Sequence, residues 1–242
     1  MYAFRSDPGA DGVGVAFTDA VAADGGLLSL GGAHGAGGRP DGVATLEADL
    51  GIELALARQV HGVTVATVGP GAARAPLPEA DALVTTGAGI GLTVRVADCV
   101  PVLFADAGAG VIGAAHAGRV GLAAGVLQQT VAAMRGHGAR RITAWIGPHV
   151  CGRCYEVPRP LAEEFAGQLP GTATLTSWGT PAIDLGAGVR LLLDGLGVRH
   201  RTVPGCTLQE PTLHSHRRDP AGAGRQAGII WLDGACRAGD AG

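Results

Sequence analysis

The chain has 242 residues, of which 47% are apolar and 16% charged, and its formal net charge is −3. A chain of this length can bury a core that needs no disulfides, and its charge gives no electrostatic reason to expect nucleic acid or an anionic membrane as a partner. The first residues, MYAFRSDPGADGVG, lack the apolar core of a signal peptide, and no uncharged apolar stretch of about 18 residues follows. We therefore expect a cytoplasmic protein, with no membrane partner, that is a monomer or a weak homodimer.

The apolar pattern of the first half predicts mostly strands. Residues 41–50 are typical of a short helix that ends near Gly51, and residues 54–60 and 63–68 of strands on either side of His61. A loop rich in Gly, Pro and Ala occupies 69–78. Buried strands are predicted at four apolar runs after that loop, namely 82–85, 92–97, 102–105 and 111–115.

The period changes from residue 120 onwards. Apolar residues recur at steps of three and four over 120–134, which predicts an amphipathic helix that Gly136 can cap. A strand at 141–146, helices at 160–169 and 183–196, and a strand at 229–232 are predicted after it. No linker or repeat divides the chain, so we expect one α/β (α+β) domain over residues 1–242, with mixed β-sheets flanked by helices.

Three polar positions interrupt or end the apolar runs. They are His61, the pair Asp98-Cys99 and His116. A single His or Cys in apolar surroundings is more often a core residue than a ligand. Asp98, however, lies within VADCVPVLF and needs a partner if it is buried, which favours a functional turn. Two His and one Cys can supply three of the four positions of a catalytic zinc ion.

Longer strings carry a resemblance to a known family. They are RQVHG (58–62), EADALVT (79–85), LTVRVADCVPVLFAD (92–106), IGAAHAG (112–118), GLAAGVLQQTVAAM (121–134) and AWIGPHVCGRCYEV (144–157), with weaker strings LLSLGGAH (27–34), CT (206–207), SHRRD (215–219) and IIWL (229–232). This combination closely resembles the laccase-domain family, whose members were formerly named polyphenol oxidases. The family is better described as zinc-dependent purine nucleoside phosphorylases with adenosine deaminase side activity.

The resemblance implies a fold, a metal and substrates. It matches His61, Cys99 and His116 to the family's zinc ligands and implies a mixed-sheet fold distinct from the Rossmann fold. The implied partners are phosphate and purine nucleosides such as adenosine, inosine and methylthioadenosine. The family usually reads HAGWRG where this chain reads HAGRVG, so that Arg119 stands one place early and an aromatic residue is lost.

Candidate roles follow for the residues around the metal. Zinc could lower the pKa of bound water for attack on C6 of adenine, with Asp98 as the proton-carrying acid or as the group that fixes a ligand imidazole. In phosphorolysis zinc could polarise the purine. We expect Gln59 to contact substrate and Arg58, Arg119 or Arg217 to bind phosphate.

Other interpretations of the same residues stay open. His61, Cys99 and His116 also match a blue-copper ligand set, and Cys99 with His116 could form a metal-free thiol hydrolase dyad. A metal-binding module without activity is a further alternative. The Cys151-Gly-Arg-Cys154 pair has the spacing of a redox pair or of half a zinc site, but no second CxxC completes it. We therefore expect one zinc ion per chain, with copper as the alternative.

Overall fold

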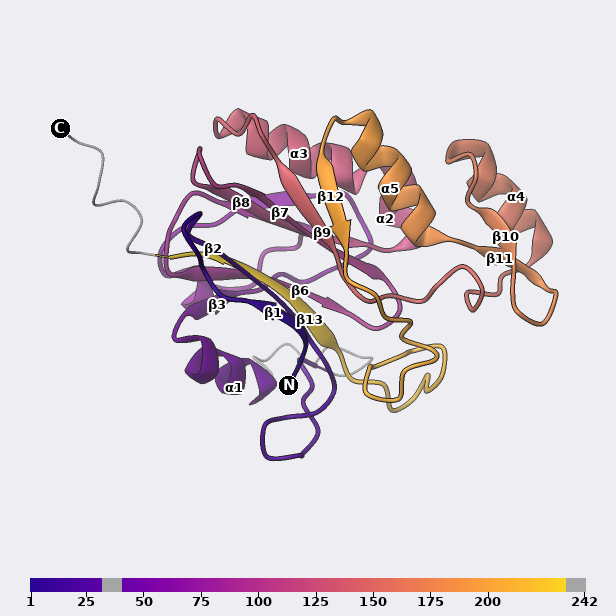
Figure 1. Ribbon diagram of the computed structural model, residues 1–242, viewed down its shortest axis with the longest axis horizontal. Helices are drawn as coiled ribbons and strands as arrows, with labels where there is room; N and C mark the ends of the chain where they lie inside the picture. Colours follow the sequence, from indigo (N-terminus) through magenta and orange to yellow (C-terminus); the bar gives the residue numbers. More distant parts are fainter. Residues whose placement is uncertain (32–40, 234–242) are drawn as a thin grey trace.

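The computed structural model describes residues 1–31 and 41–233 as two stacked β-sheets with helices on both outer faces (Figure 1). The first sheet has the order β1 (Tyr2–Ser6), β2 (Val13–Thr18), β13 (Gln226–Leu232), β6 (Ile90–Val96) and β3 (Glu53–Ala55). The second has the order β12 (Arg199–Thr202), β9 (Thr143–Ile146), β7 (Val100–Asp106), β8 (Val111–Ala117), β5 (Ala82–Thr85) and β4 (Val65–Thr67).

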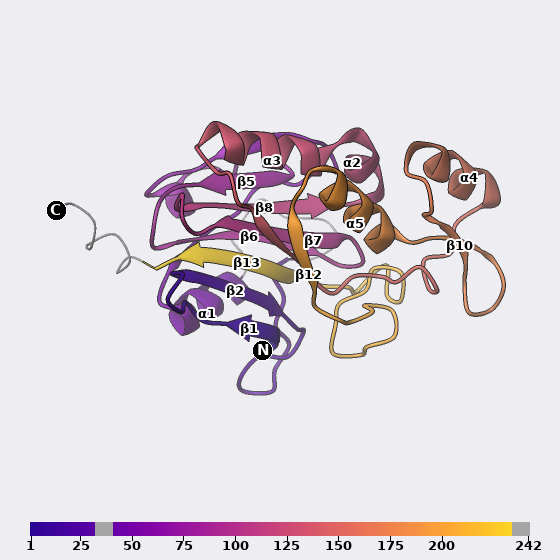
Figure 2. The ribbon, with the colours of Figure 1, turned by 45° about the horizontal axis from the view of Figure 1, so that its top comes forward.

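Three apolar layers join these sheets and helices. Between the sheets, Leu92 and Ile230 of the first sheet pack with Leu103 and Ile112 of the second. The outer face of the second sheet is covered by α2 (Arg119–Ala124), α3 (Val126–Gly136) and α5 (Leu185–Gly195), and that of the first by α1 (Asp41–Leu50), as Figure 2 shows. Strands β7 and β8 are buried along their whole length because both of their faces are covered.

Smaller elements complete the described chain. Helix α4 (Arg159–Gln168) and the two-stranded sheet of β10 (Ala173–Leu175) and β11 (Pro181–Ile183) form a projection at one side of the molecule (Figure 1). A 3₁₀ turn, η1 (Ala72–Arg74), lies in the predicted loop. None of the helices in the described ranges is long and apolar enough to cross a membrane.

The predicted mixed α/β class is confirmed, and several element boundaries are corrected. The single helix predicted over 120–134 is two helices, because Gly125 has a φ of +101° and ends α2 before α3 begins. Helix α5 begins at Leu185, since Ile183 belongs to β11 and the Asp184 side chain accepts a hydrogen bond from the Ala187 N–H. Strands β1, β2, β10, β11 and β12 were not predicted. Residues 32–34, the end of the LLSLGGAH string, lie outside the described residues, as does Cys236, the last of the five cysteines in the sequence.

The strand predicted over 54–60 is also shorter. Regular backbone pairing with β6 stops at Ala55. Further along the chain, the side-chain amide of Gln59 makes the hydrogen bonds to β6 in place of the backbone. Its Nε2 donates to the Arg95 carbonyl and its Oε1 accepts from the Arg95 N–H, both at 2.8 Å. Gln59, expected to contact substrate, therefore uses its amide to attach the segment before His61 to the first sheet.

Candidate metal centre

Strand pairing in the second sheet gathers the three predicted ligands at one end of that sheet. Pro101 of β7 pairs with His116 of β8, which places Cys99, two residues before Pro101, beside the end of β8. On the other side of β8, the His116 N–H donates to the carbonyl of Asp81, just before β5. His61 reaches the same place from the loop before β4. Residues far apart in the sequence therefore meet because β7, β8 and β5 are neighbours.

The geometry of the three side chains fits a metal ion. One ligand atom from each of His61, Cys99 and His116 lies within 4.8 Å of the others. The Cys99 Sγ is 3.8 Å from the His61 Nε2, against about 3.5 Å expected between sulfur and nitrogen on a tetrahedral zinc ion. The two imidazole rings meet edge to face, with centroids 4.7 Å apart. His116 is buried, Cys99 half-buried and His61 exposed, so the position left for a fourth ligand opens towards solvent.

Asp81 orients two of these ligands, a role that no motif in the sequence indicates. Its Oδ1 accepts hydrogen bonds from the His61 N–H and the His116 Nδ1–H, at 2.9 and 2.8 Å. Its Oδ2 accepts from the N–H groups of Val60 and Gly62, at 3.1 and 2.7 Å. Burial alone would raise the pKa of Asp81, but these hydrogen bonds hold it at about 2. The carboxylate thus leaves the His116 Nε2 free to face a metal.

The charges of the ligand set also favour a cation. Burial opposes ionisation, yet His116 and His61 together lower the pKa of Cys99 to about 6. Burial likewise opposes a charge on His116, but Cys99 and Asp81 raise its pKa to about 9. Without metal, the pair is therefore a thiolate beside an imidazolium near neutral pH. A bound cation would take the place of the imidazolium proton.

Two site residues have the left-handed backbone conformation, which is unusual for residues other than glycine. The φ of His61 is +62° and that of Asp98 is +88°, a conformation that costs about 1–2 kcal/mol. The Asp98 carboxylate accepts from the Thr207 hydroxyl at 2.6 Å and the Arg217 N–H at 2.7 Å. The expectation that Asp98 fixes a ligand imidazole is therefore corrected, because Asp81 does so.

Two of the expected phosphate-binding residues gather around Tyr155. The Arg217 guanidinium lies over the Tyr155 ring, 5.0 Å from its centre, and donates to the Glu156 carbonyl. The Arg119 side chain is near enough to Tyr155 for its positive charge to act against a rise in the Tyr155 pKa. Burial and the nearby Cys99 raise the pKa of Tyr155, so its hydroxyl stays protonated. Two cations and a hydroxyl donor therefore border the metal centre.

The other arginines of the region differ in their surroundings. Arg58 is exposed and forms an ion pair with Glu79, so its charge is already matched. Arg225, which was not among the predicted site residues, lies near Cys99 and Asp98. Burial lowers its pKa while those two groups act in the opposite direction. No local pattern in the sequence marks Arg225, because its neighbours come from a different part of the chain.

Gly118, the residue before helix α2, is in close contact with two residues of the candidate metal centre. A Cβ atom at Gly118 would lie 2.7 Å from the His61 Cδ2 and 3.2 Å from the Cys99 Sγ. The φ of Gly118 is −74° and its ψ 164°, which other residues adopt without strain. Glycine is therefore required here for space and not for its backbone conformation.

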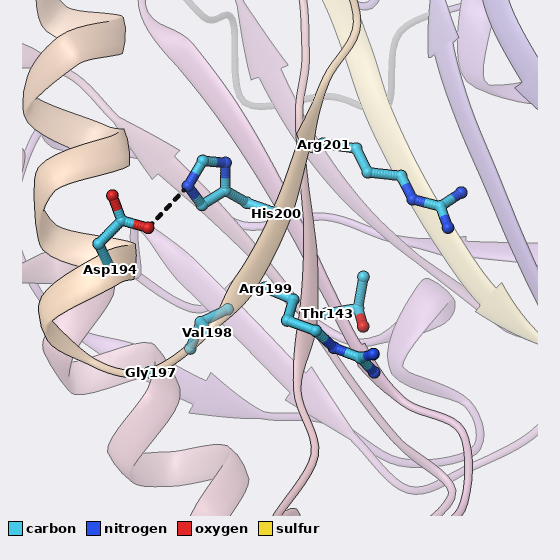
Figure 3. Close-up of a pocket in the computed structure, with 7 residues that line it drawn as sticks. All are labelled: Thr143, Asp194, Gly197, Val198, Arg199, His200 and Arg201. Carbon is cyan, nitrogen blue, oxygen red and sulfur yellow. Dashed lines mark hydrogen bonds and ion pairs between the residues drawn. The ribbon is translucent and has the colours of Figure 1, made fainter.

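A separate surface pocket lies along the edge strand β12, away from this centre. Figure 3 shows the His200 imidazole directed to Asp194, with 3.1 Å between the His200 Nε2 and the carboxylate, while Arg199 and Arg201 point to the other side of the strand. Charged side chains on an edge strand oppose pairing with a second sheet. None of the predicted site residues lines this pocket.

Sequence relatives place this geometry in a known family. The profile of a family described as "Multi-copper polyphenol oxidoreductase laccase" matches residues 41–233. The purine nucleoside phosphorylase ORF3 of Streptomyces griseus is 49% identical over 247 aligned residues, which cover 95% of this chain and 98% of that protein. A purine nucleoside phosphorylase of Streptomyces coelicolor is 50% identical over 178 residues, which cover 72% of this chain and 73% of that protein.

Solved structures show the same fold. A Neisseria meningitidis protein of the DUF152 family superposes with a TM-score of 0.79 at 32% identity, covering 96% of this chain and 99% of that chain. YlmD from Geobacillus stearothermophilus gives a TM-score of 0.78 at 29% identity, covering 92% of both chains. The stacked sheets of Figure 1 are therefore shared by these proteins.

Proposed function

We propose that this chain, which belongs to the multi-copper polyphenol oxidoreductase laccase family, is a zinc-dependent purine nucleoside phosphorylase. One observation carries the proposal: a relative named purine nucleoside phosphorylase aligns over 95% of the chain. The His61–Cys99–His116 centre supports it, because neutral imidazoles and a thiolate suit zinc. Zinc, when bound, would act as a Lewis acid that polarises the purine leaving group.

The chain's own residues then supply the binding of phosphate. In phosphorolysis a phosphate oxygen attacks C1′ of the ribose while the bond from C1′ to the purine breaks, and the purine takes up a proton. We assign phosphate to Arg119 and Arg217, which flank Tyr155 beside the centre, because guanidinium groups bind phosphate with paired hydrogen bonds. Arg58 is not assigned, since Glu79 already neutralises it.

We propose adenosine deamination as a slower side activity. It requires an acid that carries protons, and both candidate carboxylates in the described site are engaged. Asp81 accepts four hydrogen bonds, and Asp98 accepts one on each oxygen. Asp98 is buried and each of its oxygens already has a donor, which is why we expect phosphorolysis to be faster.

The test is incubation of the purified protein with adenosine, with and without phosphate, followed by chromatographic separation of adenine from inosine. We expect adenine and ribose 1-phosphate only when phosphate is present, and inosine more slowly in both cases. Inosine alone would replace the proposal with a deaminase. No product from any purine nucleoside, with metal bound, would contradict both assignments.

The assigned roles can be tested with matched variants. Cys99→Ala should abolish turnover, because it removes the thiolate ligand. Arg119→Ala should raise the KM for phosphate by about tenfold or more, on the basis of one lost charge-assisted hydrogen bond, whereas Arg58→Ala should leave that KM unchanged. Replacing Arg119 and Val120 by Trp and Arg, the usual order in the family, should lower it. An unchanged KM in Arg119→Ala would remove Arg119 from the phosphate site.

The family's description makes copper oxidation of phenols the second candidate. Among the described residues, two groups could hold a metal, and neither collects the several histidines of a multicopper cluster. Elemental analysis of protein prepared without added metal is expected to find zinc. Copper in its place, with oxidation of a phenol by oxygen, would favour the oxidase. A metal-free protein that still hydrolyses an ester would favour the Cys99–His116 dyad.

A further inference from the structure

A second group of sulfur atoms lies apart from the centre described above. Cys151 and Cys154 follow strand β9, and Cys206 follows strand β12. The three Sγ atoms lie within 4.8 Å of one another, with Cys154 and Cys206 buried and Cys151 half-buried. The sequence suggested only half a site in Cys151-Gly-Arg-Cys154. The fold supplies the third thiol, because β12 pairs in parallel with β9 and the loops after both strands run side by side.

A backbone N–H group connects the two loops that carry these cysteines. The N–H of Cys151 donates to the Cys206 Sγ at 3.4 Å. Such a bond offsets negative charge on a thiolate and orients it as a ligand.

We propose that Cys151, Cys154 and Cys206 bind a thiophilic divalent cation, of which Zn²⁺ is the representative, at a site distinct from the His61–Cys99–His116 centre. Three thiolates select soft and borderline metals, and the two-residue gap between Cys151 and Cys154 is the usual spacing of a structural zinc site. A fourth position is left for water or another ligand. The expected content of a fully loaded chain rises from one zinc ion to two.

The position of this thiol site indicates what the cation does. Val150, next to Cys151, donates its N–H to the Asp98 carbonyl. Thr207, next to Cys206, donates its hydroxyl to the Asp98 carboxylate. A cation held by these cysteines therefore fixes the two loops that hold Asp98, the residue before the ligand Cys99. Its role is to stabilise the turn of the first centre without touching substrate.

The metal content of three proteins tests the proposal. The unsubstituted protein, loaded with Zn²⁺ under reducing conditions and freed of excess, should hold about two zinc ions per chain. Cys99→Ala should keep the ion of the thiol site and hold about one. The double variant Cys151→Ser/Cys154→Ser should also hold about one, at the first centre. One ion in the unsubstituted protein and none in Cys99→Ala would overturn the proposal, and leave the first centre intact.

Spectroscopy covers the case in which a variant does not fold. X-ray absorption on the unsubstituted zinc protein should find about two sulfur ligands per zinc on average, at about 2.3 Å, whereas filling of the first centre alone gives one. Cobalt-loaded Cys99→Ala should show strong thiolate-to-cobalt charge-transfer absorption. Its absence, or a mass two daltons lower that marks a disulfide among these cysteines in the reduced preparation, would contradict the site. Loss of nucleoside turnover with both ions bound would count only against the proposed function.

Discussion

Replacing Asp81 by asparagine tests whether that carboxylate organises the metal centre. Each oxygen of Asp81 accepts two hydrogen bonds, Oδ1 from His61 and His116 and Oδ2 from Val60 and Gly62. An asparagine has one oxygen and one NH₂ group. Whichever way its amide lies, two donors lose their acceptor and face another donor.

The structure allows the loss of folding stability in Asp81→Asn to be estimated in two ways. Two unsatisfied donors cost about 1–3 kcal/mol each, so the free energy of unfolding should fall by about 2–6 kcal/mol. The pKa of Asp81, held at about 2, lies about two units below the value of an unfolded chain, which corresponds to about 2–3 kcal/mol. Because the folded pKa is the lower one, this stability is present above about pH 4 and is lost as the pH falls towards 2.

The effect on metal is the more specific test, because it separates orientation from general stability. Loss of the residue that orients a ligand imidazole typically lowers metal affinity by about 10–100-fold. Asp106→Asn is the matched control, since the Asp106 carboxylate also accepts backbone N–H bonds from Arg140 and Arg141, but at the far end of β7. Competition with a zinc chelator and chemical unfolding measure both quantities. If both variants lose stability and neither loses zinc affinity, Asp81 does not position the ligands.

Two further predictions concern the same centre. Between about pH 6 and pH 9, zinc affinity should rise by about tenfold per pH unit, because zinc binding in that range displaces one proton from His116. Above about pH 9 the affinity should level off. Calorimetry in buffers of different ionisation enthalpy measures the displaced proton, and a zinc affinity that does not change with pH would refute the assigned charges. Gly118→Ala should lower both zinc affinity and stability, the latter by about 1–3 kcal/mol, since its Cβ would meet His61. Gly136→Ala, whose Cβ meets nothing within 4 Å, is its control, and equal zinc affinity in the two would contradict the contact.

The parts of the fold that could be predicted from sequence are those whose own residues carry the signal. Strand β5 and the buried parts of β6, β7 and β8 are apolar runs bounded by turn residues, and α3 shows helical spacing. Strand β12 could not be found in this way. Its sequence, RHRT, is polar and largely exposed, and it is a strand only because β9 offers it a parallel partner.

The same distinction between local and tertiary signals applies to the residues of the candidate site. His61, Cys99 and His116 stand out because they interrupt or end apolar runs, and the motifs around them resemble one family. Asp81 does not stand out, since its role depends on β5 lying beside β8 and on the loop of residues 60–62 crossing the end of both. The proximity of Cys206 to Cys151 and Cys154 cannot be predicted from the sequence for the same reason. Ligands can be read from local patterns, whereas the residues that orient or complete a site depend on tertiary pairing.

Asp98 connects the two clusters of candidate metal ligands. Its backbone conformation, with φ of +88°, is one that the chain would not hold without support. The support comes from three directions: the Val150 N–H on its carbonyl, and the Thr207 hydroxyl and Arg217 N–H on its carboxylate. The first two belong to the loops of the thiol site, and the third to the segment beside Tyr155. The position of the Cys99 thiolate therefore depends on contacts that originate in the thiol site and in the proposed phosphate site. Because the carboxylate of Asp98 accepts two of these contacts, a structural role alone explains why this residue is acidic.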